Sequence, residues 1–398
     1  MPNPDLPSLE SYRKQLSADA GLIEPDKEVF EGYINEYRSK ALQKKSELLK
    51  QVANPNLLKK AEQLMDIAIR LNIDELNYNY FRAVRALERA RGNAARRAAG
   101  LAGASDGSPE LAGGMNNLDL PERMPNAMTG SDFFRNILGV DPHAKPPRMT
   151  SVLSPKEIEA VVMRQIEMGN VPNFLRQFRE VRIAGPNGIT VVTKVMPDYL
   201  SIGSDGDFMY IPVTASVAAK LAEKLNLVLP TRTMVEETFA QANRKNVGIH
   251  WNVPNVADEG YLMRHNEESA ANIDRNGLNA GHKKDIIISE YSSAHPGVLD
   301  FYGLYDEKQN PIQTSPAHYP GWREYDLGVR FASPAIQVIF PDGRTEYLDL
   351  RSSLHTRPDV GAVINRVERV GSTPDAPKPR NNRFAGNFDP GKNYRRKS

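Results

Sequence analysis

Apolar residues recur at helical spacing along the first quarter of the chain. Between residues 26 and 97 they form three stripes, separated by breaks at Asn54-Pro55 and at Asp74, and this pattern predicts three helices. Such stripes need a partner that covers them, because helix propensity alone gives marginal stability. We therefore expect an N-terminal helical unit over residues 1–97, which packs apart from the rest and offers a surface to a protein partner.

The pattern changes after residue 97. Residues 98–128 are rich in Gly, Ala, Pro, Ser and Asn, and this composition buries too little apolar surface to offset the entropy lost on ordering. Residues 372–398 are rich in Pro, Asn and Arg and share this property. The chain is therefore expected to divide into the helical unit, a flexible linker over 98–128, a folded body over 129–371 and a disordered basic tail over 372–398.

Within the body, predicted helices come first and predicted strands come later. Ser154, followed by Pro155 and Glu157, forms the sequence of a helix start with a capping box. Further helices are expected over 215–225 and 232–244. The strand candidates are 180–184 and 189–195, which flank a hairpin turn, and then 208–213, 285–289, 299–302, 329–332, 336–340 and 345–350. This grouping predicts an α+β fold with a mixed or antiparallel sheet and packed helices.

Composition and charge narrow the classes of function. The chain has 398 residues, no cysteine and a net charge of +2. The lack of cysteine excludes disulfides, thiolate metal sites and cysteine nucleophiles. A nearly neutral molecule has no general attraction to nucleic acid, so no nucleic-acid partner is expected. The chain has no apolar run near the roughly 18 residues of a membrane span and no signal-peptide pattern. We expect a cytoplasmic protein, or one exported without such a peptide.

The more specific catalytic motifs are absent. The chain has no glycine-rich phosphate loop, no GxSxG elbow and no HExxH helix, so no cofactor is assigned and common ATP- or NAD-dependent chemistry is not expected. Residues 203–207 (GSDGD) are similar to part of a calcium loop but lack the distal glutamate of a full site. A tight turn between two strands is the simpler interpretation.

Polar residues that can carry chemistry gather after His250. His282, Lys283, Lys284 and Asp285 stand directly before an apolar run that is typical of a buried strand. Binding groups often lie at such a position, because the strand fixes them while their polar ends remain reachable. The alternative is that the two lysines are solvated and that Asp285 caps a turn.

A second polar cluster begins at His318. Glu324 and Asp326 follow within eight residues, and a histidine with two carboxylates can form an acid–base pair or supply ligands to zinc. The histidine spacing matches no standard zinc signature, so metal binding stays unassigned. We predict one pocket built from His282, Lys284, Asp285, His318 and Glu324. The two clusters lead into different strands, and they meet at one sheet edge only if those strands run parallel.

Five stretches, taken in order, resemble a group of largely uncharacterised bacterial proteins. They lie within about residues 130–370 and include RQIEMGNVPNFLRQFREVRI, MPDYLSIGSDGDFMYIPVT, LPTRTMVEETFAQA, GHKKDIIIS and HYPGWREYDLGVRFAS. No function is firmly established for this group, so the resemblance implies no particular activity. Members carry YGWH and YxDYSHG motifs, and this chain has Tyr305 and Leu327 where those motifs have histidines. If these histidines are catalytic in the group, the site of this chain is altered or inactive.

Two functions from different classes are consistent with these patterns. The first is a hydrolase-like body that acts on cell-wall or peptide material, since a site rich in His, Asp and Lys suits hydrolysis. The alternative is a non-catalytic structural or secreted interaction protein, such as a component or cargo of a phage-like particle. An enzyme is expected to bring its polar groups together at a concave pocket, whereas an interaction protein leaves them scattered.

Overall fold

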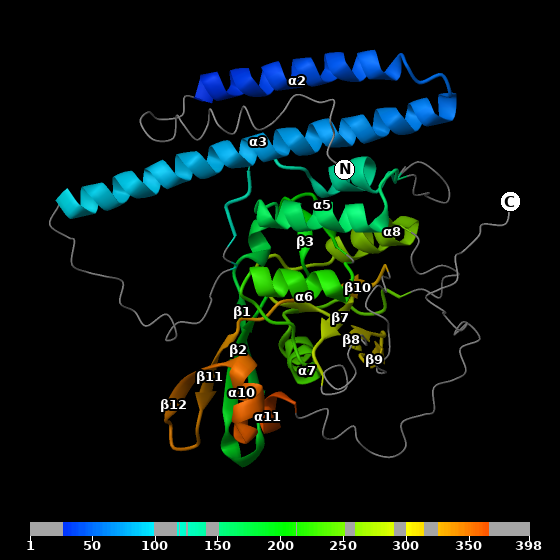
Figure 1. The fold of residues 1–398 in the computed structure, drawn as a ribbon. Helices are drawn as coiled ribbons and strands as arrows, with labels where there is room; N and C mark the ends of the chain where they lie inside the picture. The colour runs from blue at the N-terminus through cyan, green and yellow to red at the C-terminus, as the bar shows by residue number, and fades with distance from the viewer. Residues whose placement is uncertain are drawn as a thin grey trace.

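The computed structural model describes residues 27–98, 118, 120–124, 126–140, 151–211, 213–250, 259–289, 300–313 and 325–365. Two long N-terminal helices lie across one end of a body made of shorter helices and small sheets (Figure 1). The α+β class predicted from the sequence is confirmed. None of the described helices is both long and apolar enough to cross a membrane. The predicted tail and most of the predicted linker lie outside the described residues.

The N-terminal helices form an antiparallel hairpin of two helices instead of the three that we expected. They are α2 (Lys27–Leu49) and α3 (Pro55–Ala98). The break at Asn54 is confirmed, and its side chain accepts a hydrogen bond from the backbone N–H of Asn56 at 2.9 Å. The break predicted at Asp74 is wrong. Ile73 and Leu76 both pack into the hairpin core, so the apolar face continues through this point and Asp74 lies inside the helix.

The middle of α3 contacts the body. Ile67 and Leu71 pack with the main apolar core, and Arg70 donates a hydrogen bond to the backbone oxygen of Asn126 at 3.1 Å. Glu75 forms an ion pair with Arg164 of the body. The hairpin is therefore joined to the body by both apolar and charged contacts.

The end of the predicted linker also packs on the body. Leu118, Met124 and Met128 are buried, and the N–H of Leu118 donates to the backbone oxygen of Arg176 at 2.7 Å. The low apolar content of residues 98–128 is an average over the whole stretch. Three large apolar side chains near its end are nevertheless buried, and they hold that end against the body. The other proposed domain boundaries stay a prediction.

Helices of the body cover the sheets. The capping box at Ser154 is confirmed: Glu157 accepts the Ser154 N–H at 2.8 Å and returns its own N–H to Ser154 Oγ at 3.4 Å. The helices predicted over 215–225 and 232–244 are also present. The set comprises α4 (Gly130–Asp132), η1 (Phe133–Ile137), α5 (Pro155–Glu167), η2 (Asn173–Leu175), η3 (Pro186–Gly188), α6 (Ala215–Lys224), α7 (Arg232–Gln241), α8 (Glu259–Ala270), α10 (Leu350–Thr356) and α11 (Pro358–Ile364).

One four-stranded sheet is antiparallel throughout. Its strands, in spatial order, are β1 (Arg179–Ala184), β2 (Thr190–Val195), β11 (Ala335–Ile339) and β12 (Thr345–Asp349). The predicted hairpin is confirmed by the pairing of β1 with β2. Its turn contains Asn187 and Gly188 at φ values of 59° and 74°, a region that asparagine and glycine tolerate best. Apolar residues of α10 and α11 cover one face of this sheet.

A second four-stranded sheet positions the polar residues described below. Its spatial order is β10 (Leu327–Gly328), β7 (Lys284–Ile287), β8 (Asp300–Tyr305) and β9 (Pro311–Gln313). β10 runs parallel to β7, with Leu327 opposite Lys284. The strand expected over 329–332 is replaced by the shorter and earlier β10. The backbone after β10 does not continue the ladder with β7, because Val329 accepts a hydrogen bond from the N–H of Leu200 and Phe331 accepts one from that of Met196. Two-stranded pairs join β3 (Ser201–Gly203) to β4 (Phe208–Tyr210) and β5 (Arg244–Lys245) to β6 (Asn279–Ala280).

Candidate functional site

Four consecutive polar residues at the start of β7 are buried. His282 and Lys283 are 0% exposed, Asp285 is 1% exposed and Lys284 is 7% exposed. Burying charged groups is costly unless each is paired or hydrogen-bonded. The expectation of solvent-reachable lysine and carboxylate groups is therefore wrong for this segment, and its partners decide what it can do.

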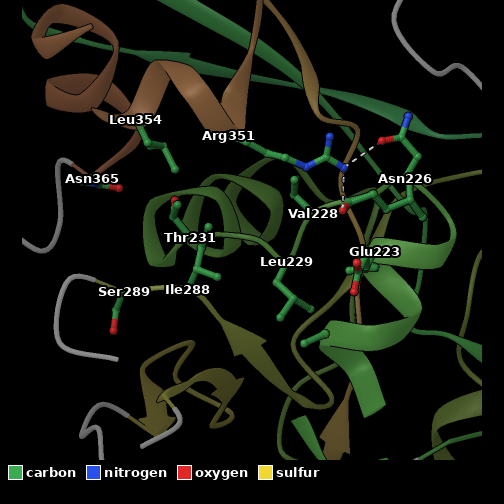
Figure 2. Close-up of a pocket in the computed structure, with 13 residues that line it drawn as sticks. Glu223, Asn226, Val228, Leu229, Thr231, Ile288, Ser289, Arg351, Leu354 and Asn365 are labelled. Carbon is green, nitrogen blue, oxygen red and sulfur yellow. Dashed lines mark hydrogen bonds between the residues drawn. The ribbon is translucent and has the colours of Figure 1, made fainter. Parts of the chain in front are cut away.

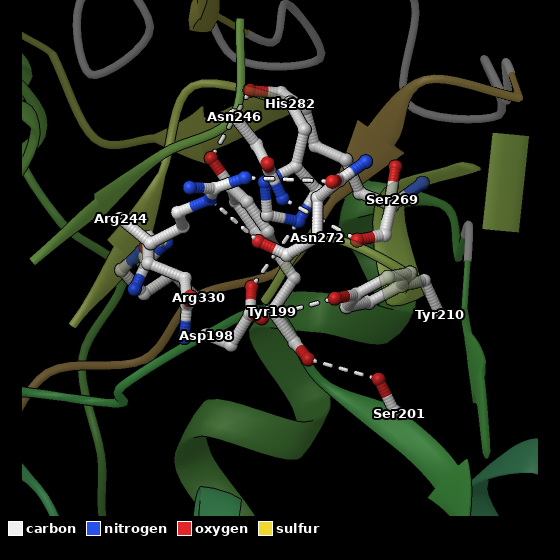
Figure 3. A network of polar contacts seen from close by, with 12 residues as sticks. Asp198, Tyr199, Ser201, Tyr210, Arg244, Asn246, Ser269, Asn272, His282 and Arg330 are labelled. Atoms are coloured by element: carbon white, nitrogen blue, oxygen red, sulfur yellow. Dashed lines mark hydrogen bonds and ion pairs between the residues drawn. The ribbon is translucent and has the colours of Figure 1, made fainter. Parts of the chain in front are cut away.

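His282 faces Asp198 in the interior of the body (Figure 3). Nε2 of the imidazole lies 3.2 Å from Asp198 Oδ1. The Asp198 carboxylate also accepts hydrogen bonds from the Tyr210 hydroxyl at 2.9 Å and from the Tyr199 N–H at 2.8 Å. Burial lowers the pKa of His282 below its usual value, although Asp198 opposes this shift. The imidazole therefore lies buried between a carboxylate and two tyrosine rings.

Asp285 belongs to a second group of contacts, which shares Tyr199 with the first. Its Oδ2 accepts a hydrogen bond from the Tyr199 hydroxyl at 2.8 Å, and its Oδ1 lies 3.6 Å from Nε of Arg330. Arg330 is 1% exposed and donates to the backbone oxygens of Met196 and Asn279, both at 2.7 Å. Burial raises the pKa of Asp285 to about 6, in spite of the opposing Arg330 charge.

Lys283 extends into an aromatic and imidazole environment. Its Nζ donates to the backbone oxygen of Tyr325 at 3.1 Å and lies 3.4 Å from Nδ1 of His265. The ammonium also stands 5.1 Å from the centre of the Tyr210 ring. Burial lowers the pKa of Lys283 to about 7, although Asp326 and Asp198 oppose this. Burial likewise holds the pKa of His265 well below 6.5, and Ser269 Oγ lies 3.2 Å from the same Nδ1.

The third group of contacts reaches the surface. Lys284 Nζ lies 3.2 Å from Asp326 Oδ1, and Nδ1 of His250 lies 3.2 Å from Asp326 Oδ2. The Asp326 side chain is 1% exposed, whereas the His250 side chain is 34% exposed. The Tyr325 hydroxyl is 3.3 Å from the same His250 nitrogen. A buried carboxylate therefore contacts Nδ1 of a histidine that solvent can reach.

The structure places the five residues of the predicted pocket unequally. His282, Lys284 and Asp285 lie on one short segment and share a single polar network. His318 and Glu324 lie outside the described residues, so their approach to this segment stays a prediction. The parallel pairing of β10 with β7, on which that approach depends, is confirmed.

Several members of the network were not in the predicted pocket. Asp198, Tyr210 and Arg330 come from distant parts of the chain, and His265 lies on α8, a helix that the sequence pattern did not predict. Asp198, Tyr210 and Arg330 share one signal, a polar residue whose sequence neighbours are apolar, whereas His265 stands between Arg264 and Asn266 and lacks it. That signal is weak in a single sequence, because most such residues are solvated or bonded locally.

The loop over 203–207 is a tight turn, as expected. The Ser204 N–H donates to the backbone oxygen of Asp207 at 2.9 Å. Asp207 accepts the Ser131 N–H at 2.8 Å, and Asp205 accepts the Phe174 N–H at 3.2 Å. The two carboxylates therefore tie neighbouring segments together. Within the described ranges, no group of three or more His, Asp or Glu side chains is arranged to hold a metal ion.

The two positions at which the resemblance predicts histidine carry apolar contacts in this chain. The ring of Tyr305 stacks on Phe239 with 3.6 Å between centroids, and Leu327 is buried in the main core. Neither position therefore supplies an imidazole at this end of the sheet.

Burial shifts several pKa values in this network. The pKa of Asp285 is raised to about 6, that of Lys283 is lowered to about 7 and those of His282 and His265 are lowered, and such shifted groups are enriched in active sites. Structural ion-pair networks also shift pKa values, so a shifted pKa does not by itself distinguish a catalytic residue from a structural one. A catalytic side chain must in addition be accessible to a substrate. Of these side chains, His250 is the most accessible. Comparison of the chain with protein-family models, with curated proteins and with solved structures gave no match.

Proposed function

We propose that the chain is a hydrolase that acts on peptide or cell-wall material, with His250 as general base and Asp326 as the carboxylate that orients it. One observation carries the proposal: Asp326 is buried and lies 3.2 Å from Nδ1 of a partly exposed imidazole. A carboxylate at Nδ1 selects the tautomer in which Nε2 has a free lone pair, and it stabilises the imidazolium that forms during proton transfer.

The reaction follows from this arrangement. Nε2 of His250 takes a proton from a water molecule, and the water oxygen attacks the carbonyl carbon of the substrate amide. The C–N bond of the tetrahedral intermediate then breaks, and the imidazolium returns the proton to the leaving nitrogen. Lys284 shares Asp326 with His250, so it helps to hold the carboxylate that orients the imidazole.

The inner residues support this site instead of reacting. His282, Asp285 and Arg330 are each at most 1% exposed, and the ion pair between Arg330 and Asp285 joins the segment after β10 to β7. Lys283 donates to the backbone oxygen of Tyr325, the residue before Asp326. The inner network thereby fixes the backbone that carries the orienting carboxylate.

The test compares wild type with His250→Gln and Asp326→Asn on purified peptidoglycan and on a mixed peptide library, with products detected by mass spectrometry. Each substitution is expected to lower kcat/KM by about 100-fold or more, the usual effect of removing a general base or its orienting partner. Asp342→Asn, which changes an exposed turn carboxylate, serves as the matched control. Full activity of His250→Gln would refute the proposal.

A second candidate function is a non-catalytic interaction protein. It is favoured by Leu42, Leu57 and Leu64 of the hairpin, whose exposed fractions are 48%, 59% and 39%. Leu57 and Leu64 are seven residues apart and lie on the same side of α3. Exposed apolar residues that share a face mark interaction surfaces. A folded wild-type protein that releases no product from either substrate would favour this candidate over the hydrolase.

A further inference from the structure

A cavity of about 640 Å³ lies at the opposite end of β7 from His282. Its walls come from α6, the segment after α6, the residues after β7, and α10 (Figure 2). The apolar part of the wall includes Ala222, Leu227, Leu229, Ile288 and Leu354. This volume falls in the range of small-molecule sites, which combine apolar walls with a few placed polar groups.

Arg351 is held at one side of this cavity. Its Nη2 donates to Asn226 Oδ1 at 3.0 Å and to the backbone oxygen of Leu227 at 3.2 Å. Its Nη1 lies 3.6 Å from Asp349 Oδ2. A guanidinium has five N–H donors, so Nε–H and one Nη1–H remain available to a ligand. These fixed contacts orient the guanidinium in advance, which reduces the entropy lost when a carboxylate binds.

Glu223 supplies a negative charge on the same side. It lies in the last turn of α6, Asn226 follows just after the end of that helix, and both residues line the cavity. Figure 2 shows Glu223, Asn226 and Arg351 together on one side of the cavity. Glu223 has no ion-pair partner among the residues that the structure describes. The cavity therefore presents one cation and one anion beside an apolar wall.

We propose that this cavity binds a small apolar α-amino acid or a dipeptide of such residues. The α-carboxylate would contact Arg351, the α-ammonium would contact Glu223, and the apolar side chain would lie against Leu229 and Ile288. A fatty acid satisfies only the arginine, and an apolar amine satisfies only the glutamate. A zwitterionic head group on an apolar body matches all three features of the wall.

Isothermal titration calorimetry tests the ligand class. L-leucine and L-phenylalanine are expected to bind at concentrations up to about 10 mM, a weak affinity that suits small ligands at a partly exposed site. N-acetyl-L-leucine lacks the ammonium, L-leucinamide lacks the carboxylate and glycine lacks the apolar side chain, so each is expected to bind at least about tenfold more weakly. Absence of heat from both amino acids, or equal binding of the acetylated ligand, would overturn the proposal.

Variants locate the binding. Arg351→Gln and Glu223→Gln are each expected to weaken L-phenylalanine binding by about tenfold. Ala219→Trp, at an exposed position that lines the cavity, fills its mouth and is expected to abolish binding. Lys220→Trp, the next residue on the same helix, is the matched control and should bind as wild type does. Circular dichroism confirms that each variant is folded, and a folded Ala219→Trp protein that still binds contradicts the assignment.

Discussion

The Nζ atom of Lys283 meets a carbonyl, an imidazole and an aromatic face, but within the described ranges no carboxylate lies at ion-pair distance from it. Its pKa is lowered to about 7 because the charged form loses its hydration. Burial favours the neutral form of neighbouring Asp285 as well, and it therefore raises the pKa of this carboxyl group. Near neutral pH the two groups therefore change charge within a small interval.

Lys283 makes stability depend on alkaline pH in a predictable direction. Its pKa is lower in the folded state than the value of 10.5 expected on unfolding, so the unfolded chain binds more protons between these values and stability rises with pH across them. Relative to Lys283→Met, the free energy of unfolding of wild type should increase by about 2 kcal/mol between about pH 7 and about pH 9. Urea unfolding of both proteins at the two pH values measures this.

Exposed Lys220 provides the control for that measurement. Lys220→Met removes an exposed ammonium, and its difference from wild type at the two pH values is the reference against which the Lys283→Met difference is judged. If the difference between wild type and Lys283→Met changes with pH no more than this reference does, Lys283 keeps an ordinary pKa and the account of its burial is wrong.

At the scale of single residues, the sequence pattern identified the polar segment from His282 to Asp285 but did not predict that its side chains are buried. The run from His282 to Asp285 stands out because four polar residues precede an apolar strand. Its partners Asp198 and Arg330 are single residues in otherwise apolar stretches, and only the fold brings them together. Local patterning cannot report a contact that depends on long-range topology.

Among the elements, α5 owes its sharp start to two residues. Ser154 and Glu157 exchange hydrogen bonds across the first turn, and they satisfy backbone N–H groups that have no helical partner. Ser154→Ala should therefore lower the free energy of unfolding by about 1 kcal/mol. Chemical denaturation measures the loss, and Ser154→Thr, which keeps the hydroxyl, should recover most of it. Equal stability of the alanine and threonine variants would show that the cap contributes little.

Element types were easier to predict than element lengths. Capping and turn residues act within a few positions, so the starts of α3 and α5 and the hairpin turn at Asn187 were visible in the sequence. The third N-terminal helix was predicted from Asp74, because aspartate favours helix N-termini. In the structure, Arg70 pairs with Asp74 one turn away, at 3.2 Å, and the helix continues. An aspartate that can cap the N-terminus of a helix can equally form an ion pair with an arginine one turn away inside the helix.

The contact between hairpin and body is organised around Asp74. Its side chain is 2% exposed and lies beside a cavity of about 1060 Å³ that is lined by α2, α3 and residues 124–132. Gln165 of α5 donates to it at 3.5 Å. Burial raises the pKa of Asp74 to about 6, although Arg70 opposes the shift. This contact is therefore sensitive to mildly acidic pH.

The sign of that sensitivity follows from the raised pKa. The folded state binds a proton at Asp74 more tightly than the unfolded state, so the stabilisation is complete below about pH 3.8 and is lost as pH rises through about 6. Relative to Asp74→Asn, wild type should lose about 1 kcal/mol of unfolding free energy from about pH 5 to about pH 7.5. Thermal and urea unfolding at both pH values check this, with exposed Asp66→Asn as control. A change of opposite sign would contradict the assignment.

For the whole molecule, the order of elements was sufficient to predict the α+β class. The separation of hairpin from body was harder to judge, because the apolar residues that join them, such as Ile67 and Leu118, belong to segments with an otherwise polar or flexible composition. A few buried side chains decide whether two parts of a chain dock. Composition averaged over thirty residues does not resolve them.

The length of α3 has a mechanical consequence. At 1.5 Å per residue its 44 residues extend about 66 Å, and its contacts with the body include those between Ile67 and Glu75 (Figure 1). The contact with α5 can therefore act as a pivot, and about 34 Å of helix extend from Glu75 to Ala98. A tilt of the helix by about 5° about this contact moves Ala98 by about 3 Å. Any repacking beneath α5 is therefore magnified at the end of the helix.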